Sequence, residues 1–406
     1  MGISWLLLLF STAHFYIEVD SKDSKETAKL RSVQVLFRHG ARAPSEQITD
    51  PNYHSSFPRG LGEMTDRGFE NSYKLGRYLK KRYVDKGFLD PIMKPKEMFW
   101  RSVNKNRCLS TASTVGFAMF DDQIRHIHVP VVTEEIDEKL LNYNLDNCPR
   151  EVELVRERCP NFDGNYHPWP RYEAFIANCL NYTHPVFAEY PFETIEAYMN
   201  EYKNSIPPPP LIEKHINEIM AIYVNVTQFI TGTGNHHDPR MMKVKFGFLM
   251  ETLLENIREM KESRESKEKT DVKKFTVYST QDWILMGVLD SLGVLNKTVG
   301  LEVYPEYNSM IIIELWEEKS GKFYVKTYYK KEEITAENHE LIDVSNLVRN
   351  CEESEPNCSY EKFVRCCDDY KSDEGEGCEV QKRKRNIRGL SIDKAERKKP
   401  LFAGPE

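Results

Sequence analysis

The stretch that organises the chain is VQVLFRHGARAP, residues 33–44. Its first five residues are apolar except for Gln34 and include two β-branched valines, which predicts a buried strand, and Gly40 lets the following backbone approach its neighbours closely. Arg38 and Arg42 flank His39, so two planar guanidinium groups, each able to bind phosphate oxygens through two hydrogen bonds, lie beside an imidazole. These residue types are suited to phosphoryl transfer, with His39 as the nucleophile and both arginines binding phosphate.

The protonation state of His39 follows from these neighbours. Two adjacent cations disfavour the imidazolium, so they lower the pKa of His39 and leave the ring nucleophilic near and below neutral pH. Taken singly, each residue is ordinary, because many strand ends carry an arginine or a turn histidine. The whole string is specific. Arg-His-Gly-Ala-Arg-Ala-Pro after a hydrophobic strand resembles the signature of the histidine acid phosphatases, a branch of the histidine phosphatase superfamily, at every fixed position.

Length and composition agree with a large folded enzyme. The chain has 406 residues, of which 40% are hydrophobic and 29% charged, so as a whole it is neither disordered nor membrane-spanning. One large domain with a smaller inserted one fits this length. The formal net charge of -7 argues against a nucleic-acid surface, which needs clustered positive charge. A small anionic ligand needs only a local cluster of positive charge, and the family resemblance implies that the partner is a small-molecule or protein phosphate monoester.

Three features indicate the secretory pathway. Residues 1–13 contain the run WLLLLF and end in small residues, which we interpret as a cleaved signal peptide, too short to span a bilayer. Glycosylation acceptors begin at Asn181, Asn225, Asn296 and Asn357. Nine cysteines are typical of a disulfide framework; a zinc site is the alternative, but the ligand spacing of structural zinc is missing. We expect a secreted or lumenal protein, extracellular or lysosomal, without a metal.

The cysteines differ in their expected states. Cys108 lies in a predicted buried helix and is the candidate for the odd free thiol. Cys351 and Cys358 are close enough in sequence to form a local bridge. The other cysteines are expected to tie the middle of the chain to its C-terminal end.

Two helices are predicted after the organising stretch. The first begins at the N-cap Thr65 and carries Phe69, Tyr73, Gly76, Leu79 and Tyr83 at helical spacing, which predicts its buried face. The second covers residues 105–120.

Just before that second helix, the segment RSVN, residues 101–104, corresponds to an Arg-Ser-Thr-Asp-like segment of the family. The resemblance therefore implies that Arg101 is a third phosphate-binding residue. Arg107 also matches a position that is usually arginine.

The middle of the chain has a different pattern from its two ends. Residues 148–260 are mainly helical in pattern and are interrupted by HPWP and PPPP, which mark connectors because proline runs fit neither helix nor sheet. We interpret this part as a helical cap over the site. In the family such a cap shapes the leaving-group side.

A second buried strand is predicted at residues 275–279, followed by a helix over 283–295. Residues 310–316 and 323–329 form a predicted hairpin at the edge of the sheet, joined through Ser320 and Gly321. The predicted fold is thus α/β: a mixed sheet flanked by helices, with an inserted, smaller α-helical cap domain. The phosphatase domain comprises residues 30–147 and 261–378, the cap comprises 148–260, and 379–406 form a basic disordered tail.

The turn after the second strand supplies the other half of the site. It reads Ser279-Thr280-Gln281-Asp282, where the family has Ser-Ala-His-Asp or similar. The resemblance implies that Asp282 is the general acid that protonates the leaving alcohol. Gln281 replaces the family's histidine; it can donate a hydrogen bond to phosphate but supplies no charge. Losing the charge costs about 1 to 2 kcal/mol, or roughly a five- to thirty-fold lower rate.

The leading hypothesis is an acid phosphatase that hydrolyses phosphate monoesters through a phosphohistidine on His39, with no cofactor. Because an ordinary carboxyl group titrates near ~4, the need for a protonated Asp282 implies an acidic optimum. One alternative is a catalytically impaired relative that binds phosphorylated ligands, suggested by Gln281. Another is a non-enzymatic secreted interaction protein that uses the basic tail. The resembling family forms dimers, so a homodimer is a further expectation.

Overall fold

The computed structural model describes residues 28–121, 126–134, 140–141, 148–164, 169–266, 272–331, 340–372 and 378. The expected signal peptide (1–13) and the basic tail (379–406) lie outside these residues, so the structure does not bear on either prediction. Within the described part of the chain, no helix combines the length and the apolarity that crossing a membrane requires.

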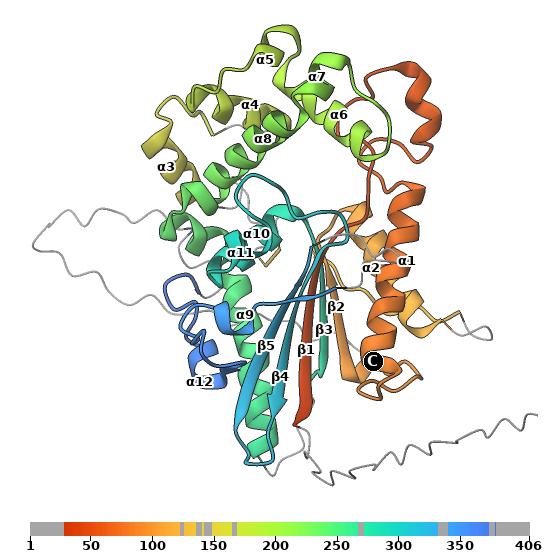
Figure 1. Cartoon of the computed structure of the whole chain (residues 1–406), viewed down its shortest axis with the longest axis vertical. Coiled ribbons are helices and arrows are strands. Elements are labelled where there is room, and N and C mark those ends of the chain that lie inside the picture. Colours follow the sequence, from red (N-terminus) through yellow and green to blue (C-terminus); the bar gives the residue numbers. More distant parts are fainter. Residues whose placement is uncertain are drawn as a thin grey trace, which may run out of the picture.

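A mixed sheet forms the centre of the molecule, as predicted (Figure 1). Its strands lie in the order β2-β3-β1-β4-β5-β6, and β7 also pairs with β5. The first three strands in this order run parallel to one another, and β4 and β5 form the predicted antiparallel hairpin. The hairpin is not wholly at the edge, because β4 pairs with β1. The strands are β1 (Lys29–Arg38), β2 (Met98–Ser102), β3 (Phe275–Thr280), β4 (Met310–Glu317), β5 (Phe323–Lys330), β6 (Ile342–Asp343) and β7 (Cys358–Ser359).

Helices cover both faces of this sheet. Helices α1 (Asp66–Leu79) and α2 (Asn106–Phe120) lie on one face, and α9 (Pro239–Glu265) and α10 (Asp282–Ser291) lie on the other (Figure 1). Successive side chains of β1 alternate between the two layers: Val35 and Phe37 pack with α1 and α2, whereas Leu36 packs with α9 and α10. The strand is therefore buried on both sides, which explains its nearly continuous apolar sequence.

The predicted N-cap of α1 is confirmed, and the predicted buried face is confirmed in part: Gly76, Leu79 and Tyr83 are buried, but Tyr73 is not. The Thr65 side chain accepts a hydrogen bond from the Gly68 amide (3.3 Å), whereas Tyr73 is 36% exposed. The close contact with α2 requires small residues: a Cβ atom at Gly76 would lie 2.3 Å from the carbonyl oxygen of Val115. At this contact the small residues, and not Tyr73, therefore face inward. The buried residues are Gly68, Asn71, Ser72, Leu75, Gly76 and Leu79.

The cap helices gather at the end of the sheet where β1 ends (Figure 1). Helix α9 begins beside them and continues along the sheet, where the side-chain amide of Gln34 in β1 donates to the carbonyl of Leu253 (2.8 Å). One continuous helix thus joins the cap to the sheet. The helices other than α1, α2, α9 and α10 are α3 (Pro149–Arg158), α4 (Trp169–Cys179), α5 (Pro185–Glu189), α6 (Phe192–Lys203), α7 (Pro210–Lys214), α8 (Ile216–Thr231), α11 (Leu295–Thr298) and α12 (Tyr360–Phe363).

Three disulfides fasten this arrangement. The predicted local bridge Cys351–Cys358 is present, and Cys148–Cys378 ties the middle of the chain to its C-terminal end. A third bridge, Cys159–Cys179, is internal to the cap. Cys108 is free and buried, as predicted, but the buried neighbours Cys366 and Cys367 are free as well.

Candidate active site

A cavity of about 630 Å³ lies between the sheet and the cap helices. Five of the six predicted site residues line it, and they come from the ends of two neighbouring parallel strands. Arg38, His39 and Arg42 follow β1, whereas Gln281 and Asp282 follow β3. Ligands of open α/β sheets bind at this position, beyond the carboxyl ends of the strands.

The loop after β1 is held by close backbone contacts. The His39 amide donates to the carbonyl of Thr280 at the end of β3 (3.1 Å), and the Gly40 amide donates to the Thr111 hydroxyl (3.0 Å). A Cβ atom at position 40 would lie 2.6 Å from the carbonyl oxygen of Gly68, so only glycine fits. The expected close approach at Gly40 is confirmed.

The hydrogen bonds of His39 fix its tautomer. Nδ1 lies 2.8 Å from the carbonyl oxygen of Gly40, which can only accept, so Nδ1 carries the proton. Nε2 therefore carries the lone pair of the ring, and in the free protein this lone pair accepts from the Nε–H group of Arg107 (3.2 Å). Burial, followed by the charges of Arg107, Arg38 and Arg42, lowers the pKa of His39 well below its ordinary value. The ring is therefore neutral at mildly acidic pH.

The third guanidinium of the cavity belongs to Arg107, not to Arg101. Arg101 is 3% exposed in β2, pairs with Glu134 (2.9 Å) and does not line the cavity. Arg107 lies in the first turn of α2, where its side chain reaches both His39 and Gln281. The expectation for Arg101 therefore has to be corrected, because the arginine that reaches the cavity comes from the helix that follows the strand.

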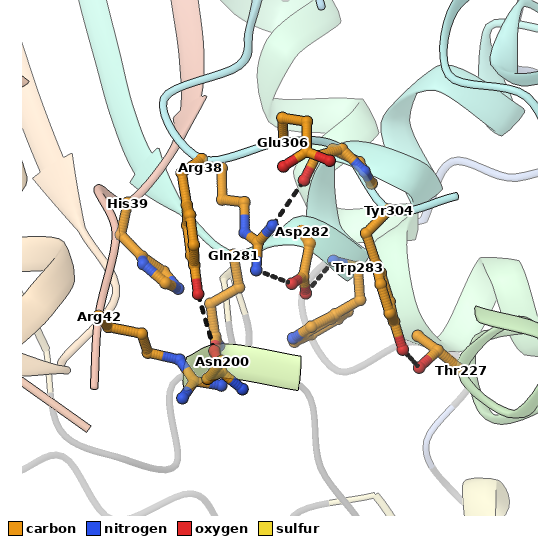
Figure 2. Close-up of polar contacts among 12 residues, drawn as sticks. Arg38, His39, Arg42, Asn200, Thr227, Gln281, Asp282, Trp283, Tyr304 and Glu306 are labelled. Atoms are coloured by element: carbon orange, nitrogen blue, oxygen red, sulfur yellow. Dashed lines mark hydrogen bonds and ion pairs between the residues drawn. The ribbon is translucent and has the colours of Figure 1, made fainter. Parts of the chain in front are cut away.

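Asp282 and Gln281 lie at the start of α10 (Figure 2). The Asp282 carboxylate pairs with Nη2 of Arg38 (2.7 Å) and accepts from the Trp283 amide (2.8 Å), so it also stabilises the first turn of the helix. The carbonyl oxygen of the Gln281 side chain accepts from Nη2 of Arg107 (3.1 Å). Gln281 thus contacts one of the arginines.

The cap side of the cavity was not predicted from the sequence. It contains two carboxyl groups, Glu196, which pairs with Arg42 (2.9 Å), and Glu173, which is 5% exposed. Burial, together with the nearby Glu196, raises the pKa of Glu173 to about 8, so this group is protonated at acidic pH. Aromatic side chains complete the wall. They are Trp169, Tyr223, Trp283, Tyr304 and Tyr307.

A separate cluster in the cap carries metal-ligand side chains. Among the described residues, only His184, His215 and Glu218 bring three such ligand atoms together. One Glu218 oxygen lies 3.0 Å from Nε2 of His184 and 3.1 Å from Nδ1 of His215. His184 Nδ1 accepts from the Val186 amide (3.3 Å), so the Nε2 proton faces Glu218. These hydrogen bonds satisfy the cluster, and none of its three residues lines the cavity.

Comparison with known proteins agrees with this geometry. Residues 29–206 and 215–330 match the family model of the histidine phosphatase superfamily, branch 2. Human prostatic acid phosphatase is 27% identical over 380 residues, which cover 90% of this chain and 89% of that protein. Bovine lysosomal acid phosphatase is 26% identical over 316 residues, which cover 75% of this chain and 71% of that protein.

Solved structures share the fold. A Hafnia alvei phytase in complex with tartrate superposes with a TM-score of 0.56 at 14% identity, covering 87% of this chain and 99% of that one. The cavity at the ends of β1 and β3, the fold and the family match lead to one conclusion: the chain belongs to branch 2 of the histidine phosphatase superfamily, a family of phosphatases.

Proposed function

We propose that this phosphatase hydrolyses phosphate monoesters by double displacement, with His39 as the nucleophile and Asp282 as the general acid. The observation that carries the proposal is the unprotonated Nε2 of His39, which lies beside Arg107 in a cavity lined by three guanidinium groups. When a phosphate binds, Arg107 donates to its oxygens, and the Nε2 lone pair is then free to attack phosphorus. A neutral imidazole beside a bound phosphoryl group is a competent nucleophile, and the arginines supply the electrostatic stabilisation that dominates phosphoryl transfer.

The first displacement forms the phosphoenzyme. Nε2 of His39 attacks phosphorus, the bond from phosphorus to the ester oxygen breaks, and the proton of Asp282 passes to the departing alcohol. Arg38, Arg42 and Arg107 bind the equatorial oxygens. In the second displacement, Asp282 accepts a proton from water, the water oxygen attacks phosphorus, and the bond from phosphorus to Nε2 breaks. Phosphate leaves, and His39 and Asp282 return to their starting states.

The contact between Asp282 and Arg38 (2.7 Å) places the proposed acid beside a proposed phosphate-binding residue. A general acid must carry a proton to donate it, which is the reason for proposing an acidic optimum. A bound phosphate competes for Arg38, and low pH then supplies the proton that Asp282 gives to the leaving group. Burial and the three arginines lower the pKa of His39 well below its ordinary value, which favours the neutral ring that acts as nucleophile.

Gln281 is proposed to reduce the rate without abolishing it. Its side-chain oxygen accepts from Arg107 (3.1 Å), so it orients a phosphate ligand but adds no positive charge. The neutral replacement costs about 1 to 2 kcal/mol of transition-state stabilisation. If the cost is much larger, the chain is a phosphate-binding relative with little turnover, which is the second candidate function.

We also propose a secreted or lumenal setting. Its support is the three disulfides, which persist in oxidising compartments. The proposed substrates are small-molecule or protein phosphate monoesters.

The test is hydrolysis of p-nitrophenyl phosphate by the purified protein from pH 3 to 8, without added metal, beside His39→Ala. We expect turnover that is highest at acidic pH and is lost in the variant. No turnover above the variant at any pH, from folded protein that still binds inorganic phosphate, favours the binding function. Activity that survives in His39→Ala contradicts the proposed nucleophile.

A further inference from the structure

The guanidinium of Arg38 is held in a fixed plane by the loop after α11. Its Cζ atom lies 4.2 Å from the centroid of the Tyr307 ring, and its Nη1 donates to the carbonyl of Pro305 (2.7 Å). Tyr307 is 2% exposed. A planar cation stacked on a buried ring keeps one orientation, which is what two-point binding of phosphate requires.

Tyr307 is in turn tied to cap helix α6. Its hydroxyl donates to Oδ1 of Asn200 (2.8 Å). The amide of Asn200 donates to Oε1 of Glu196 (2.9 Å), and the same oxygen accepts from Nη2 of Arg42 (2.9 Å). An uninterrupted series of contacts therefore runs from Arg38 to Arg42 through one helix of the cap.

The spacing on α6 explains how one helix makes these contacts. Glu196 and Asn200 are four residues apart and so share a helix face, and Asn204, at the C-cap, continues the same row. The amide of Asn204 donates to the carbonyl of Arg42 (2.9 Å), and the second oxygen of Glu196 accepts from the Ser45 amide (3.3 Å). The row thus binds both the backbone and the side chain of the loop that carries Arg42.

We propose that Glu196, Asn200 and Tyr307 are positioning residues: together they set the relative orientation of Arg38 and Arg42. The proposal rests on the function proposed above, in which these two arginines bind the substrate phosphate. Because small misplacements of binding groups cost large factors in rate, loss of a contact in this series lowers catalysis although none of the three residues is needed as nucleophile or acid.

The sharpest variant is Tyr307→Phe, which keeps the ring on Arg38 and removes only the hydroxyl. Asn200→Ala removes the acceptor of the same hydrogen bond. We expect each to lower kcat/KM by about ten-fold and to raise the inhibition constant of inorganic phosphate by a similar factor, about 1.4 kcal/mol. Asn200→Ala also removes the bond to Glu196. The double variant is therefore expected to lose little more than Asn200→Ala alone, because the Tyr307 hydroxyl acts through Asn200.

Further substitutions separate positioning from folding. Tyr307→Leu also removes the ring and is expected to lose more than Tyr307→Phe. Thr194→Val is the matched control, because Thr194 lies on α6 but accepts only from the Gln47 side chain (3.0 Å), outside the series; its kinetics should equal those of the wild type. Thermal unfolding of every variant establishes that the folded proteins are being compared.

The result that overturns the proposal is wild-type kcat/KM and phosphate affinity in folded Tyr307→Phe and Asn200→Ala. Losses that multiply in the double variant also overturn it, because they indicate independent effects. Failure of the proposed function looks different: the wild type then shows no turnover above His39→Ala. In that case the affinity for inorganic phosphate, measured by calorimetry, still tests whether the three residues position the arginines.

Discussion

The two halves of the site are anchored to different degrees. After β1, the side chains of Arg38, His39 and Arg42 each contact at least two groups, from the sheet, from α2, from the loop after α11 or from the cap. After β3, Gln281 is the N-cap residue of α10 yet makes no capping hydrogen bond, and Asp282 is 22% exposed. The half that carries His39 is therefore held by contacts to several elements, whereas the half that carries Asp282 is held by the first turn of α10 and by side-chain contacts to Arg38 and Arg107.

This difference in anchoring explains why the fold accommodates glutamine in place of the family's histidine at position 281. A substitution at His39 or Arg38 disturbs contacts to several elements at once. At position 281, glutamine replaces histidine and contacts mainly Arg107, so the change leaves the surrounding packing intact. The comparison predicts that catalysis is more sensitive to the acid and the arginines than to residue 281.

The largest effect after loss of the nucleophile is expected for Asp282→Asn. This variant cannot protonate the leaving group, and general acid catalysis contributes about 10²- to 10⁴-fold. For an alkyl phosphate, whose leaving alcohol needs the proton, the loss in kcat should be near the upper end of this 10²- to 10⁴-fold range. For p-nitrophenyl phosphate, whose leaving group needs the proton less, the loss should be smaller. Equal losses for the two substrates contradict the role of Asp282 as an acid.

The next-largest loss of kcat is expected at Arg107, and Arg101 serves as the comparison. Arg107→Ala removes a donor to the transition state and is expected to lower kcat by about 10²-fold. Arg101→Lys, measured under the same conditions, should leave kcat of the folded protein unchanged and lower its stability, because Arg101 is buried away from the cavity beside Glu134. The reverse pattern, with Arg101 needed for turnover and Arg107 dispensable, argues against the site described here.

Restoring the family residue is a smaller change. Gln281→His should raise kcat by roughly five- to thirty-fold at acidic pH, where the introduced imidazole is charged. Steady-state kinetics at pH 5 measure this gain, and Gln281→Asn serves as the neutral comparison. No gain from histidine indicates that the acid half has diverged beyond this one position.

The smallest effect concerns stability and not rate. Burial raises the pKa of Glu173 from 4.5 to about 8, so between these values the folded protein keeps a proton that the unfolded chain has lost. The free energy of unfolding therefore falls as pH rises through this window, by at most about 1.4 kcal/mol per pH unit. Glu173→Gln should remove this decrease. Chemical denaturation at pH 5, 6.5 and 8 measures the free energy of unfolding, and Glu193→Gln, at an exposed position, is the control. If the free energy changes with pH in the same way in the wild type, Glu173→Gln and Glu193→Gln, the role assigned to Glu173 is wrong.

Much of the fold was predictable because periodicity and turn chemistry are local. The apolar run before Arg38, the Thr65 cap and the hairpin through Gly321 all gave the correct elements. The inward face of α1 was only partly predictable from hydrophobicity, since Gly76 packs closely on α2 whereas Tyr73 is exposed. Pairwise contacts between helices decide such faces, and a single sequence does not contain them.

Residues that line the cavity were predictable where a motif crosses a strand end, as it does at His39 and Asp282. The third arginine was assigned to the strand residue Arg101 and not to Arg107 in the following helix, because the motif does not say which of the two faces the cavity. Glu173, Glu196 and Tyr307 carry no sequence signal. They belong to segments distant in sequence that only the folded chain brings to the same cavity.

The most direct test of the account is to trap the phosphoenzyme. The protein is mixed with a labelled phosphate monoester, quenched in alkali within one turnover and mapped by peptide mass spectrometry, beside His39→Ala. The account predicts one phosphoryl group on His39 that is stable in alkali, labile in acid and absent from the variant. Turnover without label, or label on another residue, contradicts the phosphohistidine mechanism.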